Sequence, residues 1–515
     1  MGASAAAKLV RNTVVNGVGN LTAIVVGLAL TPFLIHRLGL QTYGVWALAL
    51  TIAFAGGYAS LSELGIEAAT VRYVAESHAE RDLAALSRSV GTSLAVFCAV
   101  AAVLAPLAVA LAHPLVLLLG VPIHERHDAT VCFALVGAQL IFEIPARAFV
   151  AVLEGVQRYA VYQLVESGRG LLQAALYVLA ILQGRGIVGL AGAFALSSLV
   201  SLVALCIAAH RAVPGLRASP LRASRAELAR VLGFGSEVFS LRILSTVYRQ
   251  MDRVIIGVAL GTRPVGVYEI ANKVSLGVGG IGSLTASAVV PAAASLRRHG
   301  ALMRDMFVRG SCYAMAVALP FEVAAFIFAR PLLLSWIGPS AAPAVGAVRL
   351  FCAYGMLQST NNVASTMIFG VGQIRLPLAV GALATLLNLG LSIALVRPLG
   401  FSGVIVGTLI ANGLAWPVLV WYYLRVFDCP LGEWWRRLIA PNLPGLALQV
   451  AVSLPLYAAV GAHSRSLILT LCMVAASVAV SLAAFVSIGL RGEDRRALLH
   501  TARSAAGLRS PEVSA

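Results

Sequence analysis

Residues 90–112 read VGTSLAVFCAVAAVLAPLAVALA, a run of 23 residues without a charged side chain. The hydrocarbon core of a bilayer is about 30 Å thick, so a helix rising about 1.5 Å per residue crosses it in about 20 residues. The run therefore predicts a transmembrane helix. Thirteen further segments of this kind lie on either side of it. The fourteen predicted spans are residues 13–35, 43–62, 90–112, 129–151, 170–184, 187–209, 234–260, 265–291, 310–334, 344–369, 376–396, 402–424, 443–461 and 467–490.

The fifth predicted span is the shortest, because Arg169 and Arg185 limit it to fifteen residues. Joining it to the sixth would leave thirteen spans. The composition excludes a soluble multidomain protein: 59% of the 515 residues are hydrophobic and 11% are charged, against about 25% charged in soluble domains. We therefore predict an all-α, polytopic membrane protein with about 14 transmembrane helices (12 to 14).

The formal net charge of +17 does not indicate nucleic-acid binding, since the basic residues lie at the ends of the apolar runs and not in one patch. With the N-terminus inside and the spans alternating, 25 Lys and Arg side chains fall inside and seven outside. This asymmetry predicts that both termini are cytoplasmic. The first apolar run follows Lys8 and Arg11 and exceeds a signal-peptide core of about 7–15 residues, so we expect a retained first helix.

A short signature occurs twice, 222 residues apart. Leu38–Gly39 followed by Gly44–Trp46 corresponds to Leu260–Gly261 followed by Gly266–Tyr268. Each copy lies at the predicted outer turn between the first two spans of its half. We therefore predict two related, parallel helical bundles around a central cavity. The predicted parts are an N-terminal bundle at 1–210, a basic cytoplasmic linker at 211–233, a C-terminal bundle at 234–424, two additional spans within 425–490 and a cytoplasmic tail at 491–515.

Several short motifs occur along most of the chain. They are RNT at 11–13 with PF at 32–33, RLG at 37–39, YGVW at 43–46, LG at 64–65, VRYVAE at 71–76, DRVIIG at 252–257 and VGVY at 265–268. Each motif is loose, but together they resemble the Wzx-like polysaccharide-export flippases of the multidrug/oligosaccharidyl-lipid/polysaccharide superfamily.

The resemblance implies a flippase that moves an undecaprenyl-diphosphate-linked oligosaccharide across the bacterial inner (cytoplasmic) membrane by alternating access. The product would be an envelope polysaccharide, such as an exopolysaccharide or O-antigen. Partners implied are the lipid-linked saccharide, the bilayer, a polysaccharide polymerase and export proteins. No phosphate-binding P-loop, zinc-protease helix or hydrolase elbow occurs in the sequence. We therefore expect no cofactor, no metal site and no enzymatic activity.

Ionisable residues inside the predicted spans are the candidate functional residues. Each charge at the bilayer centre costs about 2.5–3.5 kcal/mol, so most should face a bundle interior or a wet cavity. They are Glu143, Arg147, Arg242, Arg249, Asp252, Arg253, Glu269, Lys273, Glu322 and Arg349.

In the seventh span, Arg242, Arg249 and Arg253 are spaced seven and four residues apart and share one helical face. One interpretation is a basic strip that receives a diphosphate or an acidic sugar, because guanidinium matches phosphate geometry. The other is a ladder of salt bridges between helices, with Arg253 extended toward the interface. Asp252 follows Arg249 by three residues and is expected to neutralise it in part.

Glu143–Arg147 and Glu269–Lys273 have the spacing and order of intrahelical ion pairs, so they serve either helix assembly or substrate binding and gating. Glu322 has no charged neighbour in its span. It is either a protonatable coupling site or a packed, protonated side chain.

Asn12, Asn16 and Asn20 recur every four residues on the first helix, where they bind sugar hydroxyls or fix helix packing. Our predicted substrate-binding residues are Arg242, Arg249, Arg253, Lys273, Arg147 and Asn16. The predicted coupling residues are Glu322, Glu143 and Asp252.

Two alternative functions remain open from the residues. A drug or cation exporter of the same superfamily would favour an acidic cavity, whereas the residues inside the spans are six basic against four acidic. A membrane glycosyltransferase, polymerase or ligase would be expected to use large exterior loops. The largest predicted outside loop, 113–128, has only about sixteen residues.

Overall fold

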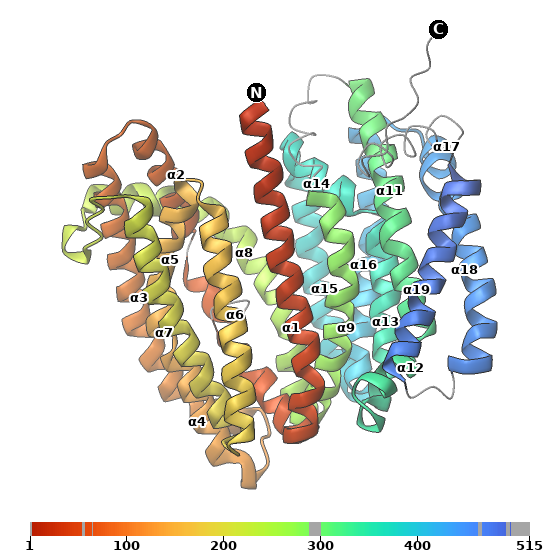
Figure 1. The fold of residues 1–515 in the computed structure, drawn as a ribbon, viewed down its shortest axis with the longest axis horizontal. Helices are drawn as coiled ribbons and strands as arrows, with labels where there is room; N and C mark the ends of the chain where they lie inside the picture. Colours follow the sequence, from red (N-terminus) through yellow and green to blue (C-terminus); the bar gives the residue numbers. More distant parts are fainter. Residues whose placement is uncertain are drawn as a thin grey trace. The chain divides into compact units, whose positions relative to one another are not determined.

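The computed structural model describes residues 3–53, 57–63, 65–287, 300–461, 466–490 and 495 (Figure 1). Across these residues the chain forms helices joined by short turns, without a β-strand. Eleven segments within this described part are long and apolar enough to cross a membrane. The predicted all-α, multi-pass architecture is confirmed.

Contacts between residues divide the chain into two compact units. The first comprises residues 1–270 and 389–404, and the second comprises 271–388 and 405–515. The division falls within one helix of the second half. The domain boundaries drawn from the sequence, at 210, 233 and 424, therefore stay a prediction.

The first unit contains eight helices in chain order and the beginning of a ninth, coloured from red to green in Figure 1. They are α1 (Ala3–Ala49), α2 (Ile66–Ala79), α3 (Leu83–Leu118), α4 (Arg126–Ala138), α5 (Leu140–Gly155), α6 (Tyr159–Leu182), α7 (Gly186–Ala212), α8 (Arg225–Leu260) and α9 (Thr262–Ser287).

Helix α3 contains the apolar run 90–112 and shows how a span is placed. Its N-cap is Asp82, whose side chain accepts a hydrogen bond from the Ala85 amide. Val90, Phe97 and other side chains of one face are buried against α2 and α5. On the opposite face, apolar side chains such as Val103 are exposed. A helix that is apolar on both its buried and its exposed face is typical of a membrane span.

The second unit contains the rest of α9 and the later helices. The end of α15 and the start of α16, residues 389–404, belong to the first unit. Its main core gathers around Phe307, which stacks on Phe427 with ring centroids 4.8 Å apart, and includes Met367 and Trp434. Its helices are α11 (Gly300–Ile327), α12 (Ala329–Trp336), α13 (Val345–Ser359), α14 (Asn362–Val371), α15 (Arg375–Leu399), α16 (Phe401–Val426), α17 (Leu431–Trp434), α18 (Leu443–Leu456) and α19 (Leu467–Ala484).

The fifth predicted span is longer than the sequence indicated. Helix α6 has 24 residues and begins at Tyr159, so Arg169 lies inside the helix and not at its end. The charge is tolerated there because the Arg169 guanidinium pairs with Glu166 at 2.9 Å. Helices α6 and α7 are separate, and the alternative of merging the fifth and sixth spans is wrong.

The second predicted span, 43–62, is not one continuous helix. Helix α1 ends at Ala49, a short 3₁₀ turn covers Tyr58–Glu63, and α2 starts only at Ile66. The break retains its hydrogen bonds: the Tyr58 amide donates to the Thr51 carbonyl oxygen at 2.7 Å, and the Ser60 hydroxyl donates to the Gly57 carbonyl oxygen. Non-helical backbone at membrane depth requires such internal partners.

The duplicated signature produces matched backbone geometry. Gly39 and Gly261 both adopt a positive φ, 79° and 85°, which glycine tolerates without strain. After each turn, a glycine packs against the other copy: a Cβ on Gly44 would overlap the Thr262 carbonyl oxygen, and one on Gly266 would overlap the Leu40 carbonyl oxygen. The two contacts correspond under the 222-residue offset, so the repeat extends from sequence to packing.

Candidate functional site

The first group of charged residues, which we call the central cluster, lies where α8 meets the beginning of α9. The Arg253 side chain forms an ion pair with Glu269 and donates a second hydrogen bond to Gln250 at 2.6 Å. The Tyr268 hydroxyl donates to Asp252 at 3.0 Å. Gln250, Asp252 and Glu269 are all buried. Two helices therefore contribute one guanidinium and two carboxylates to a nearly dry site.

This arrangement changes the interpretation of the predicted basic strip. Arg253 is paired with an acid of the neighbouring helix, as the salt-bridge alternative requires. Arg249 is exposed and forms no ion pair with Asp252, so the expected neutralisation of Arg249 by Asp252 is wrong. Tyr268 has taken its place as the partner of Asp252. The Arg242 side chain lies outside the described residues.

Asp252 retains unused hydrogen-bonding capacity. Its second carboxylate oxygen, Oδ1, is buried and has no hydrogen-bond partner in the described part of the chain. A buried acceptor without a partner costs about 1–3 kcal/mol. Such a cost is typical of sites that bind a proton, an ion or a polar ligand group.

A second group, the N-terminal cluster, joins α2, α5, α6 and α7. The Arg147 guanidinium pairs with Glu67 at 3.9 Å, and Arg169 pairs with Glu166. The Ser201 hydroxyl also donates to Glu166, at 3.2 Å. The predicted intrahelical pair of Glu143 with Arg147 does not form, because Glu67 of another helix occupies that role.

Glu143 instead lines a small cavity of about 20 Å³, bounded also by Arg147, Glu166 and Arg169. Its carboxylate oxygen Oε2 is buried and, among the residues described, has no hydrogen-bond partner. A cavity of this size holds about one water molecule. The cavity is thus suited to a proton or a water and is too small for a sugar.

Glu322 of α11 is buried against α13 in the second unit. Its carboxylate lies within hydrogen-bonding reach of the Cys352 thiol and forms no ion pair with a described residue. Gly355 provides the space for it, since a Cβ at that position would overlap the Glu322 carboxylate. The predicted isolation of Glu322 from other charges therefore extends to its tertiary surroundings.

The remaining predicted site residues are less informative. The side chains of Asn12, Asn16 and Asn20 lie outside the described residues. Lys273 is partly buried on α9, while its predicted partner Glu269 pairs with Arg253. The part of the chain described here contains no group of three His, Cys, Asp or Glu side chains arranged to hold a metal ion.

Sequence inspection missed Glu67, Glu166 and Tyr268. Glu67 lies in the short α2, outside every predicted span, and Glu166 was assigned to a loop. The spacing of Glu166 and Arg169 by three residues was an available signal. Tyr268 lies in the repeated signature at the position of Trp46, so the sequence indicated an aromatic packing residue and gave no sign of a hydrogen bond to Asp252.

The fold defines the class of protein: a multi-pass helical membrane protein whose architecture is similar to that of solved transporters. The structure of the lipid II flippase MurJ in an inward closed conformation is similar, with a TM-score of 0.73 and 13% identity over 94% of this chain and 99% of that one. An inward-facing multidrug transporter of the MATE family has a TM-score of 0.64 and 18% identity, over 80% of this chain and 94% of that one.

The sequence family described as polysaccharide biosynthesis protein matches residues 37–345, and the chain belongs to that family. It is 23% identical over 413 residues to a probable flippase, AglR, of Haloferax volcanii, covering 79% of this chain and 82% of that protein. A putative O-antigen transporter of Shigella flexneri is 21% identical over 334 residues, covering 64% of this chain and 77% of that protein. The resemblance drawn from the motifs is confirmed.

Proposed function

We propose that the protein is a flippase that moves an undecaprenyl-diphosphate-linked oligosaccharide across the bacterial inner membrane for envelope polysaccharide synthesis. The observation that carries the proposal is the family match over residues 37–345, joined to a flippase-like fold over 94% of the chain. Two relatives described as a flippase and an O-antigen transporter support the same substrate class.

Transport proceeds by alternating access in this proposal. The substrate's diphosphate and sugars cross through the protein while the polyprenyl chain stays in the lipid, because a desolvated, unpaired diphosphate would be prohibitively costly. The close backbone contacts at Gly44 and Gly266 are a candidate point of change during this cycle.

The central cluster is the proposed point of substrate contact. Arg253 is held by Glu269, and its guanidinium can exchange that carboxylate for a phosphate oxygen, which offers the same bidentate geometry. Glu269 then takes up a proton or another cation. Arg249, exposed one turn earlier on α8, adds a second positive charge.

A drug or cation exporter is the second candidate, supported by the similarity to a MATE transporter and by the buried acids Asp252 and Glu269. Such an exporter would use these carboxylates to bind a cationic substrate directly. The two candidates differ in what accumulates when the protein is lost.

The deciding experiment is deletion of the gene followed by analysis of lipid-linked saccharides in sealed inverted membrane vesicles. A flippase defect leaves complete repeat units accessible to an added glycosidase on the former cytoplasmic face. Complementation with the intact gene restores the distribution. Normal lipid intermediates together with a new sensitivity to lipophilic cations would instead establish the exporter.

A further inference from the structure

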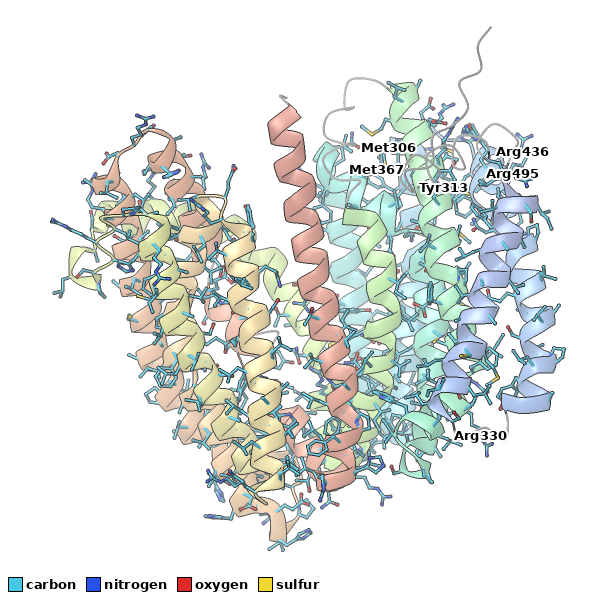
Figure 2. All side chains as sticks on the ribbon, in the orientation of Figure 1. Met306, Tyr313, Arg330, Met367, Arg436 and Arg495 are labelled. Atoms are coloured by element: carbon cyan, nitrogen blue, oxygen red, sulfur yellow. The ribbon has the colours of Figure 1, made fainter. Side chains whose placement is uncertain are left out.

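A pocket of about 230 Å³ lies at one end of the second unit. Its walls are α11, the π-helical turn Trp435–Ile439 after α17, and the end of the π-helical turn Phe485–Gly489 after α19. Figure 2 labels Tyr313 and Arg436 of this pocket at the same end of the unit, with Arg330 at the opposite end.

Three arginines line the pocket: Arg309, Arg436 and Arg437. Arg309 pairs with Asp305 at 2.9 Å, and Arg437 pairs with Asp305 and Glu433 at 2.8 Å each. These carboxylates fix two of the guanidinium groups in place.

Arg436 is different. Its Nε donates to the Gly432 carbonyl oxygen of its own turn at 3.1 Å, and it forms no ion pair with any described carboxylate. The remaining acids nearby are taken by Arg304, which pairs with Asp428 at 2.6 Å and Glu433 at 3.7 Å. Among the described residues, the positive charge of Arg436 at the pocket wall therefore has no carboxylate partner.

The surroundings are those of a membrane–water interface. Ile488 lines the pocket and is 66% exposed, and Trp435 beside Arg436 is 51% exposed. Trp421 lies under the Arg425 guanidinium, 4.7 Å from ring centroid to Cζ. Exposed tryptophans beside arginines are typical of the level of the lipid headgroups.

We propose that this pocket binds the phosphate of an anionic phospholipid headgroup from the surrounding bilayer. Arg436 supplies a positive charge that no described carboxylate pairs with, Arg309 and Arg437 supply further donors, and the exposed Ile488 contacts the first carbons of the acyl chains. The volume suits a headgroup phosphate and is below the roughly 300 Å³ of pockets for drug-sized ligands. Basic pockets between spans are recognised as headgroup sites.

The test uses the full-length protein, purified in detergent, with phosphatidylglycerol, phosphatidylcholine and inorganic phosphate as probes. Native mass spectrometry measures bound lipid. We expect phosphatidylglycerol to bind more tightly than phosphatidylcholine. Arg436→Gln should weaken phosphatidylglycerol about fivefold, the equivalent of about 1 kcal/mol for one cation at an anionic surface. Arg436→Lys should lose less, and Arg330→Gln, at the opposite end, should bind like the wild type.

Equal binding of the two lipids, or an unchanged preference in Arg436→Gln, would overturn the proposal. If inorganic phosphate displaces phosphatidylglycerol at equal concentration, the pocket is an ion site and the lipid proposal is wrong. Should Arg436→Gln fail to accumulate, Ile488→Gln decides the matter, since it removes the apolar contact and leaves the charges. Unchanged phosphatidylglycerol affinity in that variant would also count against a lipid.

Discussion

Identical side chains acquire different roles from their tertiary neighbours. Arg249 and Arg253 are one helical turn apart on α8, yet Arg249 is exposed and Arg253 is paired with Glu269. Glu143 and Glu322 are both buried carboxylates, but Glu143 faces two arginines across a small cavity and Glu322 faces a thiol. The chemistry of each site thus depends on residues distant in sequence.

The first prediction separates assembly from substrate binding at Arg253. Arg253→Gln removes the guanidinium that pairs with the buried Glu269, and breaking a buried pair in this way typically costs about 3–5 kcal/mol. The double variant Arg253→Gln/Glu269→Gln removes both charges and should accumulate normally. We expect it to transport at least about tenfold more slowly in a vesicle flipping assay, a loss of about 1.4 kcal/mol in transition-state stabilisation. Normal transport by the double variant would make the pair purely structural.

The second prediction concerns proton coupling at Glu322. Glu322→Gln keeps the shape of the side chain and should accumulate normally. If Glu322 carries the coupled proton, transport by this variant should no longer vary with pH, whereas Cys352→Ser should keep the pH dependence. Transport rates between pH 5.5 and 8.5 provide the measurement. A wild-type pH profile in Glu322→Gln would reduce the residue to packing.

Among the secondary-structure elements, the points where helices are interrupted are the best indicators of polar contacts and close packing. The break between α1 and α2, at residues 50–65, brings buried Ser60 within 3.5 Å of Thr246 on α8. Discontinuous spans are the usual sites of polar recognition in transporters because they expose backbone groups. The turns at Gly39 and Gly261 let the following helices approach within backbone contact.

The third prediction tests this backbone contact. Gly44→Ala and Gly266→Ala should each force the helices apart and lower the stability by about 1–3 kcal/mol, the usual cost of overpacking. Thermal unfolding in detergent measures the change. Gly192→Ala on α7 is the matched control, because nothing lies within 4 Å of its Cβ position and it should be neutral or slightly stabilising.

If all three alanine variants unfold at the same temperature, the reciprocal contact is not a tight one. A loss of transport in Gly44→Ala and Gly266→Ala without loss of stability would instead place the contact in the transport cycle.

At the scale of the whole molecule, the distribution of basic residues predicts the orientation. The predicted topology places 25 Lys and Arg residues inside and seven outside, an asymmetry of the kind that sets orientation during membrane insertion. The longer α6 moves Arg169 into a span and changes this balance by only one residue.

The fourth prediction is therefore topological. Reporter fusions after Arg230 and Arg496 should report the cytoplasm, and a fusion near Gly461 should report the exterior. An alkaline phosphatase and green fluorescent protein pair at each position provides the measurement. A cytoplasmic signal near Gly461 would exclude the last two spans as drawn.

A helical membrane protein, the positions of most of its spans and its family could all be predicted from the residues alone. Those properties follow from local features: an apolar run long enough for a bilayer, charges at its ends, and short motifs. The repeat could also be recognised in the sequence, because both copies contain the glycine, Gly39 or Gly261, that adopts a positive φ at the turn.

The pairing of the buried charges could not be predicted in this way, because it depends on how the helices pack. Arg147 pairs with Glu67 and not with Glu143, and Asp252 accepts a hydrogen bond from Tyr268 and forms no ion pair with Arg249. Glu269 pairs with Arg253. The physical reason is that a buried charge is stabilised by whichever opposite group is brought to it as the helices pack, and the helix spacing of three or four residues makes a pairing possible without making it the best one.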